Sequence, residues 1–487
     1  MGLLLAMSPW HCGWVALFSL APWAIAVRHS DNWRESLCHG AILGICFYAP
    51  LLDWIRTTGA DSAWNCSGTH LVAWVALSGG CSASVAIHSL LLRWLFARSC
   101  PGQLCLPIVF TLHEFNLDQV LRWGFGGNSA LVQLALTQVE MSLFVQVADL
   151  GGTFLVTWFV ATANGVVVDG FVFNADEPPC GARHRKRSFL LGAMQMSAAI
   201  VYGAWRSEFT THPGPPIGLA TAYTITGNAY EPASFVPALW VFPEDSSSTA
   251  TYDANSAPVA FQSEASQRGS PILIGCRRFK EFPTPRLYNS LLLVSAEQGL
   301  IASYDKQHLT PDAESPSPIR SWLPMWHTPG DGWLAPGDSN TVCQLPGGKA
   351  TIGTGICHDA CFPEWSRSLL NEPVPPDILV VCGSERFDAT GRIQHLLMAC
   401  AQLRAVESRR PLIRCVQQGI SGLIDGCGRV RPVRRLSEFE LAIDSAPLDG
   451  RSSLYSRIGE VGFVVFLMLM LLVAATRSWA RSNSEER

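Results

Sequence analysis

The residues that could do chemistry are a carboxylate, a lysine and a cysteine in the second half of the chain. Glu244 closes an apolar run, Lys306 lies in a mixed polar segment, and Cys357 follows another apolar run 51 residues after the lysine. A thiolate can attack a carbonyl carbon, a carboxylate can move the protons, and a fixed cation can hold the developing oxyanion. The three side chains therefore predict thiol-based acyl chemistry on an amide or an ester.

The elements that must position these residues alternate between short apolar runs and helical stretches, which is typical of an α/β layered domain. The runs predicted as buried strands are 217–222, 238–242, 271–275, 290–295, 351–356, 377–382 and 411–416. Helices are predicted over 362–370, with Pro363 in the first turn, and over 394–408. Segment 246–268 is rich in Ser, Ala, Asn and Gln without apolar periodicity, so we expect a mobile lid there.

The composition indicates a membrane protein. The 487 residues are 48% hydrophobic and only 15% charged, which is too apolar for an ordinary soluble protein. The net charge is −4, and no basic stripe interleaves with aromatic residues, so nucleic acid is excluded as a partner.

Apolar segments near the length that a bilayer requires, about 20 residues, gather at the two ends of the chain. The segments expected to span are 1–27, 37–55, 71–97, 150–168, 189–205 and 462–476. The first is predicted to be a retained anchor, because it has no basic leading region and no convincing cleavage site. Segments 104–123 and 129–147 contain charged residues. They are either interfacial or bundle-facing helices, or they line a substrate groove. We expect six or seven spans before the soluble region.

Basic residues predict the orientation. A dense basic loop is predicted over 183–187, between the spans 150–168 and 189–205, and Arg477, Arg481 and Arg487 follow the last span. The positive-inside rule places both regions in the cytoplasm. We therefore expect a transmembrane bundle over 1–206, an extracytoplasmic domain over 207–457, and a last helix with a cytoplasmic tail over 458–487.

Ordered motifs around the three residues resemble the nitrilase, or carbon-nitrogen hydrolase, superfamily. They are Val241-Phe242-Pro243-Glu244, Tyr288-Asn289-Ser290, Tyr304-Asp305-Lys306-Gln307-His308-Leu309 and Ile356-Cys357. The flanking spans and further motifs resemble the apolipoprotein N-acyltransferases. These motifs are Glu314, Phe362-Pro363-Glu364, Arg404 to Leu412, Gly419-Ile420-Ser421, and Tyr455 with Arg457.

The resemblance implies a polytopic α-helical bundle with a nitrilase-like αββα domain on the periplasmic side of a bacterial inner membrane. Such an enzyme moves a fatty acyl chain from a phospholipid to the α-amino group of the lipid-modified N-terminal cysteine of an apolipoprotein. Cys357 would form the thioester, Glu244 would move protons and Lys306 would hold the oxyanion and lower the thiol pKa. The resemblance assigns Glu314 a supporting role and implies no cofactor. A monomer is favoured.

The residues after the nucleophile depart from the family pattern, since His358-Asp359 replaces a common Tyr-Glu pair. Segments 311–314 and 382–387 also differ from the family. His358 cannot easily act as the base of Cys357, because adjacent residues on an extended chain point to opposite sides. We expect His358 and Asp359 to support the site. Cys357 and Cys361 lack a second ligand pair, so a metal site is not expected. Disulfides stay open.

Two other functions stay open. A membrane-tethered amidase or nitrilase would use the same three residues but let water resolve the thioester. A catalytically degenerate lipoprotein-binding homologue would form no acyl-enzyme at Cys357.

Overall fold

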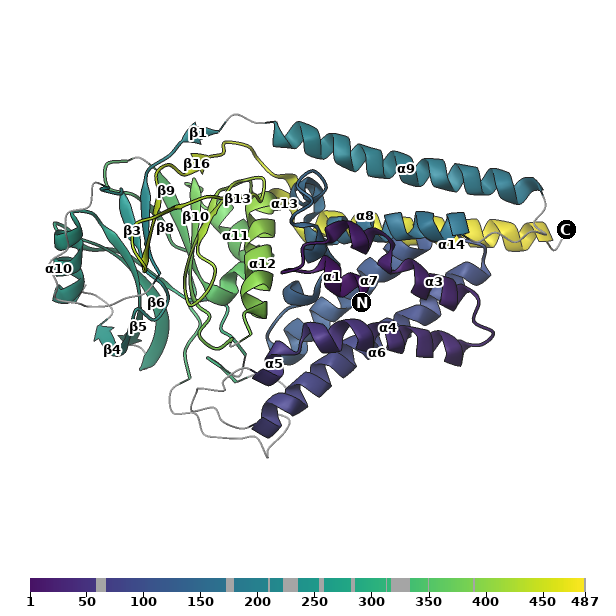
Figure 1. Cartoon of the computed structure of the whole chain (residues 1–487), viewed down its shortest axis with the longest axis horizontal. Coiled ribbons are helices and arrows are strands. Elements are labelled where there is room, and N and C mark those ends of the chain that lie inside the picture. The colour runs from purple at the N-terminus through teal and green to yellow at the C-terminus, as the bar shows by residue number, and fades with distance from the viewer. Residues whose placement is uncertain are drawn as a thin grey trace.

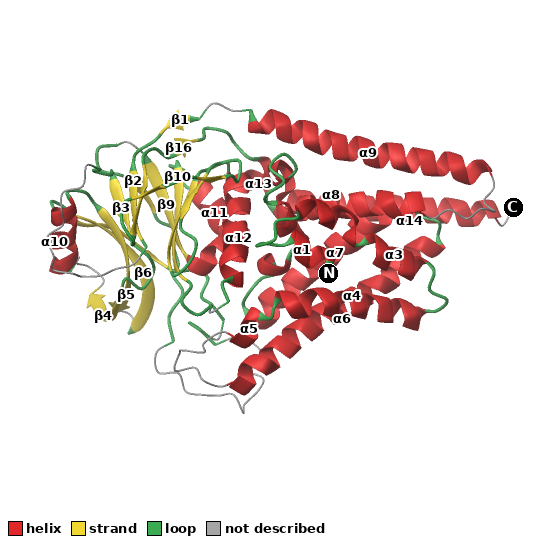
Figure 2. Cartoon of the chain, viewed as in Figure 1, coloured by secondary structure: helices red, strands yellow, loops and turns green. Residues whose placement is uncertain are grey.

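The structure has a helical part, made from both ends of the chain, beside a part with two large β-sheets (Figures 1 and 2). A small third sheet pairs β1 (His212–Pro213) with β16 (Pro447–Leu448). The structure is a computed structural model of the whole chain. It describes all residues except 58–66, 172–178, 209–210, 222–234, 254–257, 282–284, 312, 317–332, 349, 389 and 486–487. Asp312 and Arg487, both part of the predictions above, lie outside the described residues. The predicted domain limits stay a prediction.

The helical part contains most of the predicted spans as helices. Its helices are α1 (Gly2–Ala6), α2 (Ala16–Ser19), α3 (Ala21–Arg28), α4 (Trp33–Leu51), α5 (Trp54–Thr57), α6 (Ser67–Ala97), α7 (Gly102–Phe125), α8 (Ala148–Phe171), α9 (Pro179–Ser207) and, from the other end of the chain, α14 (Glu460–Glu485). Among the described residues, three helical stretches are long and apolar enough to cross a membrane: His70–Ala97, Val145–Gly170 and Arg187–Ser207. The predicted count was higher because it included segments that are shorter, broken or more charged.

Three membrane predictions are corrected. Segment 1–27 is not one span, because it breaks into α1, a 3-10 turn (Gly13–Val15), α2 and α3. Segment 129–147 is a series of 3-10 helices, η2 (Ala130–Val132), η3 (Leu134–Gln138) and η4 (Val145–Val147). The basic run 183–187 belongs to helix α9 rather than to a loop.

The charged residues of helix α7 support the bundle-facing alternative for segment 104–123. His113, Glu114 and Asp118 are buried, with 1 to 2% of each residue exposed. Glu114 accepts hydrogen bonds from Leu134 N at 2.6 Å and from Thr157 Oγ1 at 2.7 Å. These side chains face the interior of the bundle, where neighbouring helices satisfy them.

The sheet part is an αββα sandwich. One sheet has the order β14-β15-β2-β3-β5-β6-β7, with β4 paired to β5, and the other has the order β13-β12-β11-β10-β9-β8. The strands of the first sheet are β2 (Ile217–Ala220), β3 (Leu239–Val241), β4 (Ser247–Asp253), β5 (Ile272–Lys280), β6 (Arg286–Ser295), β7 (Gly299–Asp305), β14 (Arg434–Arg435) and β15 (Glu440–Ile443). Those of the second are β8 (Val342–Gln344), β9 (Thr351–Ile356), β10 (Ile378–Ser384), β11 (Leu412–Gln417), β12 (Gly422–Ile424) and β13 (Val430–Arg431). All seven predicted strands are present.

Each sheet has an apolar inner face and a helical cover. Alternate residues such as Val241, Leu293, Ile356 and Ile413 form the core between the sheets. Helix α10 (Val259–Arg268) packs on the outer face of the first sheet through Phe261. The predicted lid over 246–268 is therefore wrong for its described residues, because β4 and α10 are built into the sandwich.

Helices α11 (Pro363–Leu370) and α12 (Arg392–Ser408) lie between the second sheet and the bundle (Figure 1). Their apolar side chains belong to one continuous core with those of the bundle. The backbone approaches closely here, since a Cβ added at Gly355 of β9 would lie 2.5 Å from the indole of Trp365 in α11. The last strand residues before Cys357 are thereby fixed against a helix that touches the bundle.

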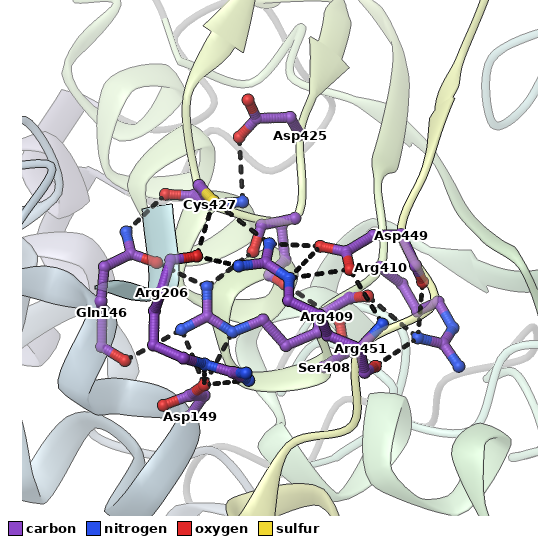
Figure 3. Close-up of polar contacts among 12 residues, drawn as sticks. Gln146, Asp149, Arg206, Ser408, Arg409, Arg410, Asp425, Cys427, Asp449 and Arg451 are labelled. Atoms are coloured by element: carbon purple, nitrogen blue, oxygen red, sulfur yellow. Dashed lines mark hydrogen bonds and ion pairs between the residues drawn. The ribbon is translucent and has the colours of Figure 1, made fainter. Parts of the chain in front are cut away.

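A buried polar joint connects α8 to the end of α12 (Figure 3). Arg409, in the left-handed region at φ 52°, is fully buried and lies 2.7 Å from the Asp149 carboxylate. Arg409 also donates to Gln146 Oε1 at 2.5 Å, and Arg206 of α9 contacts the same Asp149 carboxylate at 2.6 Å. This joint holds the sandwich on the bundle through buried, desolvated ion pairs of Asp149.

Candidate active site

The three predicted catalytic residues all lie just beyond the carboxyl ends of strands. Glu244 follows β3, Lys306 directly follows β7, and Cys357 directly follows β9. β3 and β7 belong to one sheet and β9 to the other, so strand ends from both sheets contribute to the site. This placement follows from the fold, because the core pairs the inner faces of the sheets.

Lys306 lies between two carboxylates. Its Nζ is 2.7 Å from Glu314 Oε2 and 3.5 Å from Glu244 Oε1, and only 1% of the Lys306 residue is exposed. Asn289 Nδ2 donates to Glu244 Oε1 at 2.5 Å and to Glu314 Oε1 at 2.8 Å. The structure therefore brings Glu244, Lys306 and Glu314 into one buried cluster.

Backbone amides complete the cluster. Ser384 N, at the end of β10, donates to the second oxygen of Glu244 at 3.1 Å. Thr310 N donates to Glu314 Oε2 at 2.8 Å. Each carboxylate is thus held in orientation by several donors, as a preorganised site requires.

The pKa values of Glu244, Glu314 and Lys306 are shifted in different ways. Burial raises the pKa of the Glu244 carboxyl, and the Lys306 ammonium only partly offsets this rise. Burial would also raise the pKa of Glu314, but Lys306 and its hydrogen bonds lower it to about 2. Burial opposes the charge of Lys306, yet Glu244 and Glu314 raise the pKa of its ammonium above the ordinary value. Glu314 is therefore the permanent partner of Lys306, while Glu244 is the carboxylate suited to taking up a proton.

Cys357 begins the turn η7 (Cys357–Cys361), and its φ of 47° lies in the left-handed region. The residue is half-buried, and its Cα is 3.7 Å from the position of a Cβ added at Gly383, next to the Ser384 amide that holds Glu244. Within the described part of the chain, the thiol forms no hydrogen bond with Glu244 or Lys306. In a site without substrate, such contacts are often long.

The thiol is protonated at rest. Burial and the Glu244 charge raise the pKa of Cys357 well above its ordinary value, although Lys306 acts in the opposite direction. The expected lowering of the thiol pKa by Lys306 is thus outweighed by the other two effects. A base must therefore take the proton as the sulfur attacks.

Asp359 joins the lysine segment to the nucleophile turn. Its Oδ2 accepts from Tyr304 Oη at 2.8 Å and from Ile356 N at 2.9 Å. Its Oδ1 accepts from His308 N at 3.0 Å and lies 2.8 Å from His308 Nδ1. The residue is fully buried, so these contacts tie the strand ends on both sides of the site together.

His358 has a different environment. Burial and the nearby Lys306 lower its pKa to about 4, and its ring meets Phe362 edge to face at 5.0 Å. A neutral imidazole packed on an aromatic ring agrees with a supporting place in the site rather than with an ion pair to the thiol.

Sequence reasoning omitted Asn289 from the site, although its side chain binds both carboxylates. The position of Asn289, directly before the apolar run of β6, was a signal of its role, because a buried amide side chain needs hydrogen-bond partners. Tyr304 was likewise quoted only as part of a motif, yet it holds Asp359.

Two family models match the chain. Residues 1–166 match the Apolipoprotein N-acyltransferase N-terminal domain, and residues 232–451 match Carbon-nitrogen hydrolase. An apolipoprotein N-acyltransferase of Geobacter metallireducens is 26% identical over 92% of this chain and 88% of its own length. One of Methylococcus capsulatus is 24% identical over 90% of this chain and 87% of its own length.

Among solved structures, a CN-hydrolase superfamily protein of Xanthomonas campestris covers 53% of this chain and 97% of its own chain. Its sequence identity is 18% and its TM-score 0.35. The two family matches stand in one polypeptide, and relatives align with it nearly end to end. The chain is therefore related to the apolipoprotein N-acyltransferases and carries a carbon-nitrogen hydrolase domain.

Proposed function

We propose that this enzyme transfers a fatty acyl chain from a membrane phospholipid to the α-amino group of the N-terminal diacylglyceryl-cysteine of apolipoproteins. It acts as an N-acyltransferase in a bacterial inner membrane, with the sandwich on the periplasmic side. Both substrates keep acyl chains in the bilayer, so a site docked on a membrane bundle can meet them at the level of the headgroups. A soluble amidase would not need the bundle.

The first half-reaction forms a thioester. Glu244 takes the Cys357 proton while the sulfur attacks the ester carbonyl, and Lys306 stabilises the oxyanion of the tetrahedral intermediate. The bond from the carbonyl carbon to the glycerol oxygen then breaks. The leaving oxygen takes the proton from Glu244, which releases a lysophospholipid.

The second half-reaction uses the same groups in the same order. The acceptor amine attacks the thioester carbonyl and loses a proton to Glu244, and the bond to sulfur breaks. The proton returns to the Cys357 thiolate, so the enzyme ends as it began and the acceptor carries an amide.

The observation that supports this function most is the buried arrangement of Lys306 between Glu244 and Glu314, beside the turn that begins with Cys357. One carboxylate with a raised pKa serves as the base, and the other keeps the lysine charged and in place. Water is largely excluded from the cluster, which strengthens the stabilisation of an oxyanion.

Intact-mass measurement of the purified full-length protein tests the proposal. Incubation with phospholipid should add one acyl chain to the wild type and to Cys361→Ala, but not to Cys357→Ala. Addition of a diacylated lipopeptide should then discharge the adduct and yield a triacylated product. Discharge by water alone, with release of free fatty acid at the same rate, would favour the amidase-like alternative. Absence of any adduct on the wild type would favour the degenerate homologue.

A further inference from the structure

We propose that Arg122, on helix α7 of the bundle, is a positioning residue for the turn that carries Cys357. The inference rests on the proposed function, because it concerns how the membrane part holds the nucleophile of that reaction. Arg122 touches no reacting atom and acts through the residues that follow Cys357.

Arg122 reaches from the bundle to the start of α11. Its guanidinium forms a forked pair with Glu364, in which one contact is short and the other, from Nη2 to Oε2, is 3.4 Å. Its Cζ lies 5.5 Å from the centre of the Phe362 ring. Nε donates to Asp118 Oδ2, one turn earlier on α7, at 2.5 Å. A planar fork is needed to serve both carboxylates at once, and lysine could not replace it fully.

Phe362 carries this contact to the active site. Its ring stacks on His308 at 4.0 Å with an interplanar angle of 14°, and it meets His358 edge to face at 5.0 Å. His308 in turn binds Asp359, the residue that ties the lysine segment to η7. Arg122 of α7 is thus connected to Asp359, which holds the nucleophile turn, through the side chains of Phe362 and His308.

A second contact of the bundle ends on the same turn. Asn128, in the loop after α7, donates from Nδ2 to the carbonyl oxygen of Cys361 at 2.8 Å. The loop is anchored in its turn, because Ser129 N and Oγ donate to Asp118 Oδ1 at 2.9 and 3.0 Å. Asp118 therefore fixes both Arg122 and the loop that bears Asn128.

Polar contacts hold this side of the turn in addition to the apolar packing of Ala360, Cys361 and Phe362 in the core shared with the bundle. Arg122, Asn128, Cys361 and Arg404 line a hollow of about 10 Å³ between the bundle and η7. Such a space suits roughly one water molecule. Loss of the Arg122 fork would therefore leave the turn with the Asn128 contact but without its charged contact on the bundle side.

The pair itself contributes little to global stability, since 23% of the Arg122 side chain and 40% of the Glu364 side chain are exposed. Its expected effect is on the alignment of the sulfur. A small displacement of a reacting group can slow a reaction by about a hundredfold. We expect a lower kcat with an unchanged KM for the phospholipid, because the change acts on the alignment of the sulfur.

Full-length variants in nanodiscs test this role. Arg122→Gln, Glu364→Gln and the double variant are compared with Arg93→Gln, which removes a bundle arginine that donates to Ser30 and Asp31 carbonyls instead. The rate of acylation of Cys357 at saturating phospholipid should fall by about tenfold or more in each single variant. The double variant should be no slower than the slower single variant, because both changes break one contact. Arg93→Gln should match the wild type.

Hydrogen exchange gives a readout that needs no substrate. Amide exchange in peptides that contain 356–362 should accelerate in Arg122→Gln but not in Arg93→Gln, while peptides of β10 stay protected in both. A rate of acylation equal to that of the wild type, losses that multiply in the double variant, or unchanged exchange over 356–362 would overturn the inference. A wild type without any acyl adduct would overturn the proposed function instead, and the exchange measurement would still decide the role of Arg122.

Discussion

Replacement of Asp149 by asparagine should loosen the docking of the sandwich on the bundle. The Asp149 side chain is 1% exposed and meets Arg409 Nη2 at 2.7 Å, Arg206 Nη2 at 2.6 Å and Tyr202 Oη at 2.6 Å. An amide oxygen can still accept a hydrogen bond, but the negative charge that compensates two arginines is lost. Because Arg409 is fully buried, its charge would remain without a carboxylate partner in a medium of low polarity.

Breaking a buried pair costs about 3–5 kcal/mol, and the asparagine keeps some contacts, so we expect a loss of about 3 kcal/mol in unfolding free energy. For a chain of this size that loss lowers the unfolding midpoint by about 3 °C. Thermal unfolding in detergent can be followed by the intrinsic fluorescence of the 17 tryptophans.

Asp444→Asn is the matched control. It makes the same change in a surface pair, where Asp444 is 68% exposed and lies 3.2 Å from Arg434. An exposed pair of this kind contributes about 0–1 kcal/mol, so its midpoint should shift by about 1 °C at most. Equal midpoints for the two variants would refute the view that the joint carries a buried, uncompensated charge when Asp149 is changed.

Three further outcomes are expected at and near the site. Glu244→Gln should slow acylation by about 10²–10⁴-fold. The wild-type rate should decline as pH falls through the raised pKa of Glu244, since only the carboxylate is a base. A pH–rate profile with an acid limb at the ordinary glutamate pKa of 4.5 would contradict this. Glu314, with a pKa lowered to about 2, stabilises the fold fully above its unfolded value of about 4.5, and this stabilisation is lost as pH falls towards 2. Midpoints measured across that window should therefore decline less in Glu314→Gln than in the wild type, and parallel curves would speak against the assigned pair with Lys306. Gly355→Ala should destabilise by about 1–3 kcal/mol, because its Cβ would lie 2.5 Å from Trp365. Gly79→Ala, whose Cβ meets nothing within 4 Å, should not destabilise, and equal midpoints would count against the overlap.

The sandwich could be predicted from the sequence because its strands are short apolar runs with clear ends. The run 351–356 is strand β9 with the predicted limits, and Cys357 follows it directly. The prediction of a lid failed because a segment of polar composition makes apolar contacts in the fold. Segment 246–268 is polar, but Phe261 and Ala265 pack α10 on the outer face of the first sheet. Propensity alone does not reveal such a tertiary contact.

The contacts between the two parts were beyond sequence reasoning for another reason. Arg122 and Glu364 are 242 residues apart, and Arg409 and Asp149 are 260 apart, so no local spacing links them. A similar limit applies to Asn289, whose partners lie 45 residues upstream and 25 downstream. Charged residues in apolar segments indicated that ion-pair or hydrogen-bond partners exist, but the sequence did not identify those partners.

Helix α12 has no side that faces water, since 14 of its 17 residues are buried between the second sheet and the bundle. An excised fragment that starts after α9 would present that helix and Trp365 of α11 to solvent, and such a fragment should aggregate rather than fold as a soluble enzyme. During synthesis the order of events is favourable, because the ribosome delivers α1 to α9 before the sandwich. The helices that receive α12 are then already synthesised when the sandwich emerges, and α14 is synthesised last.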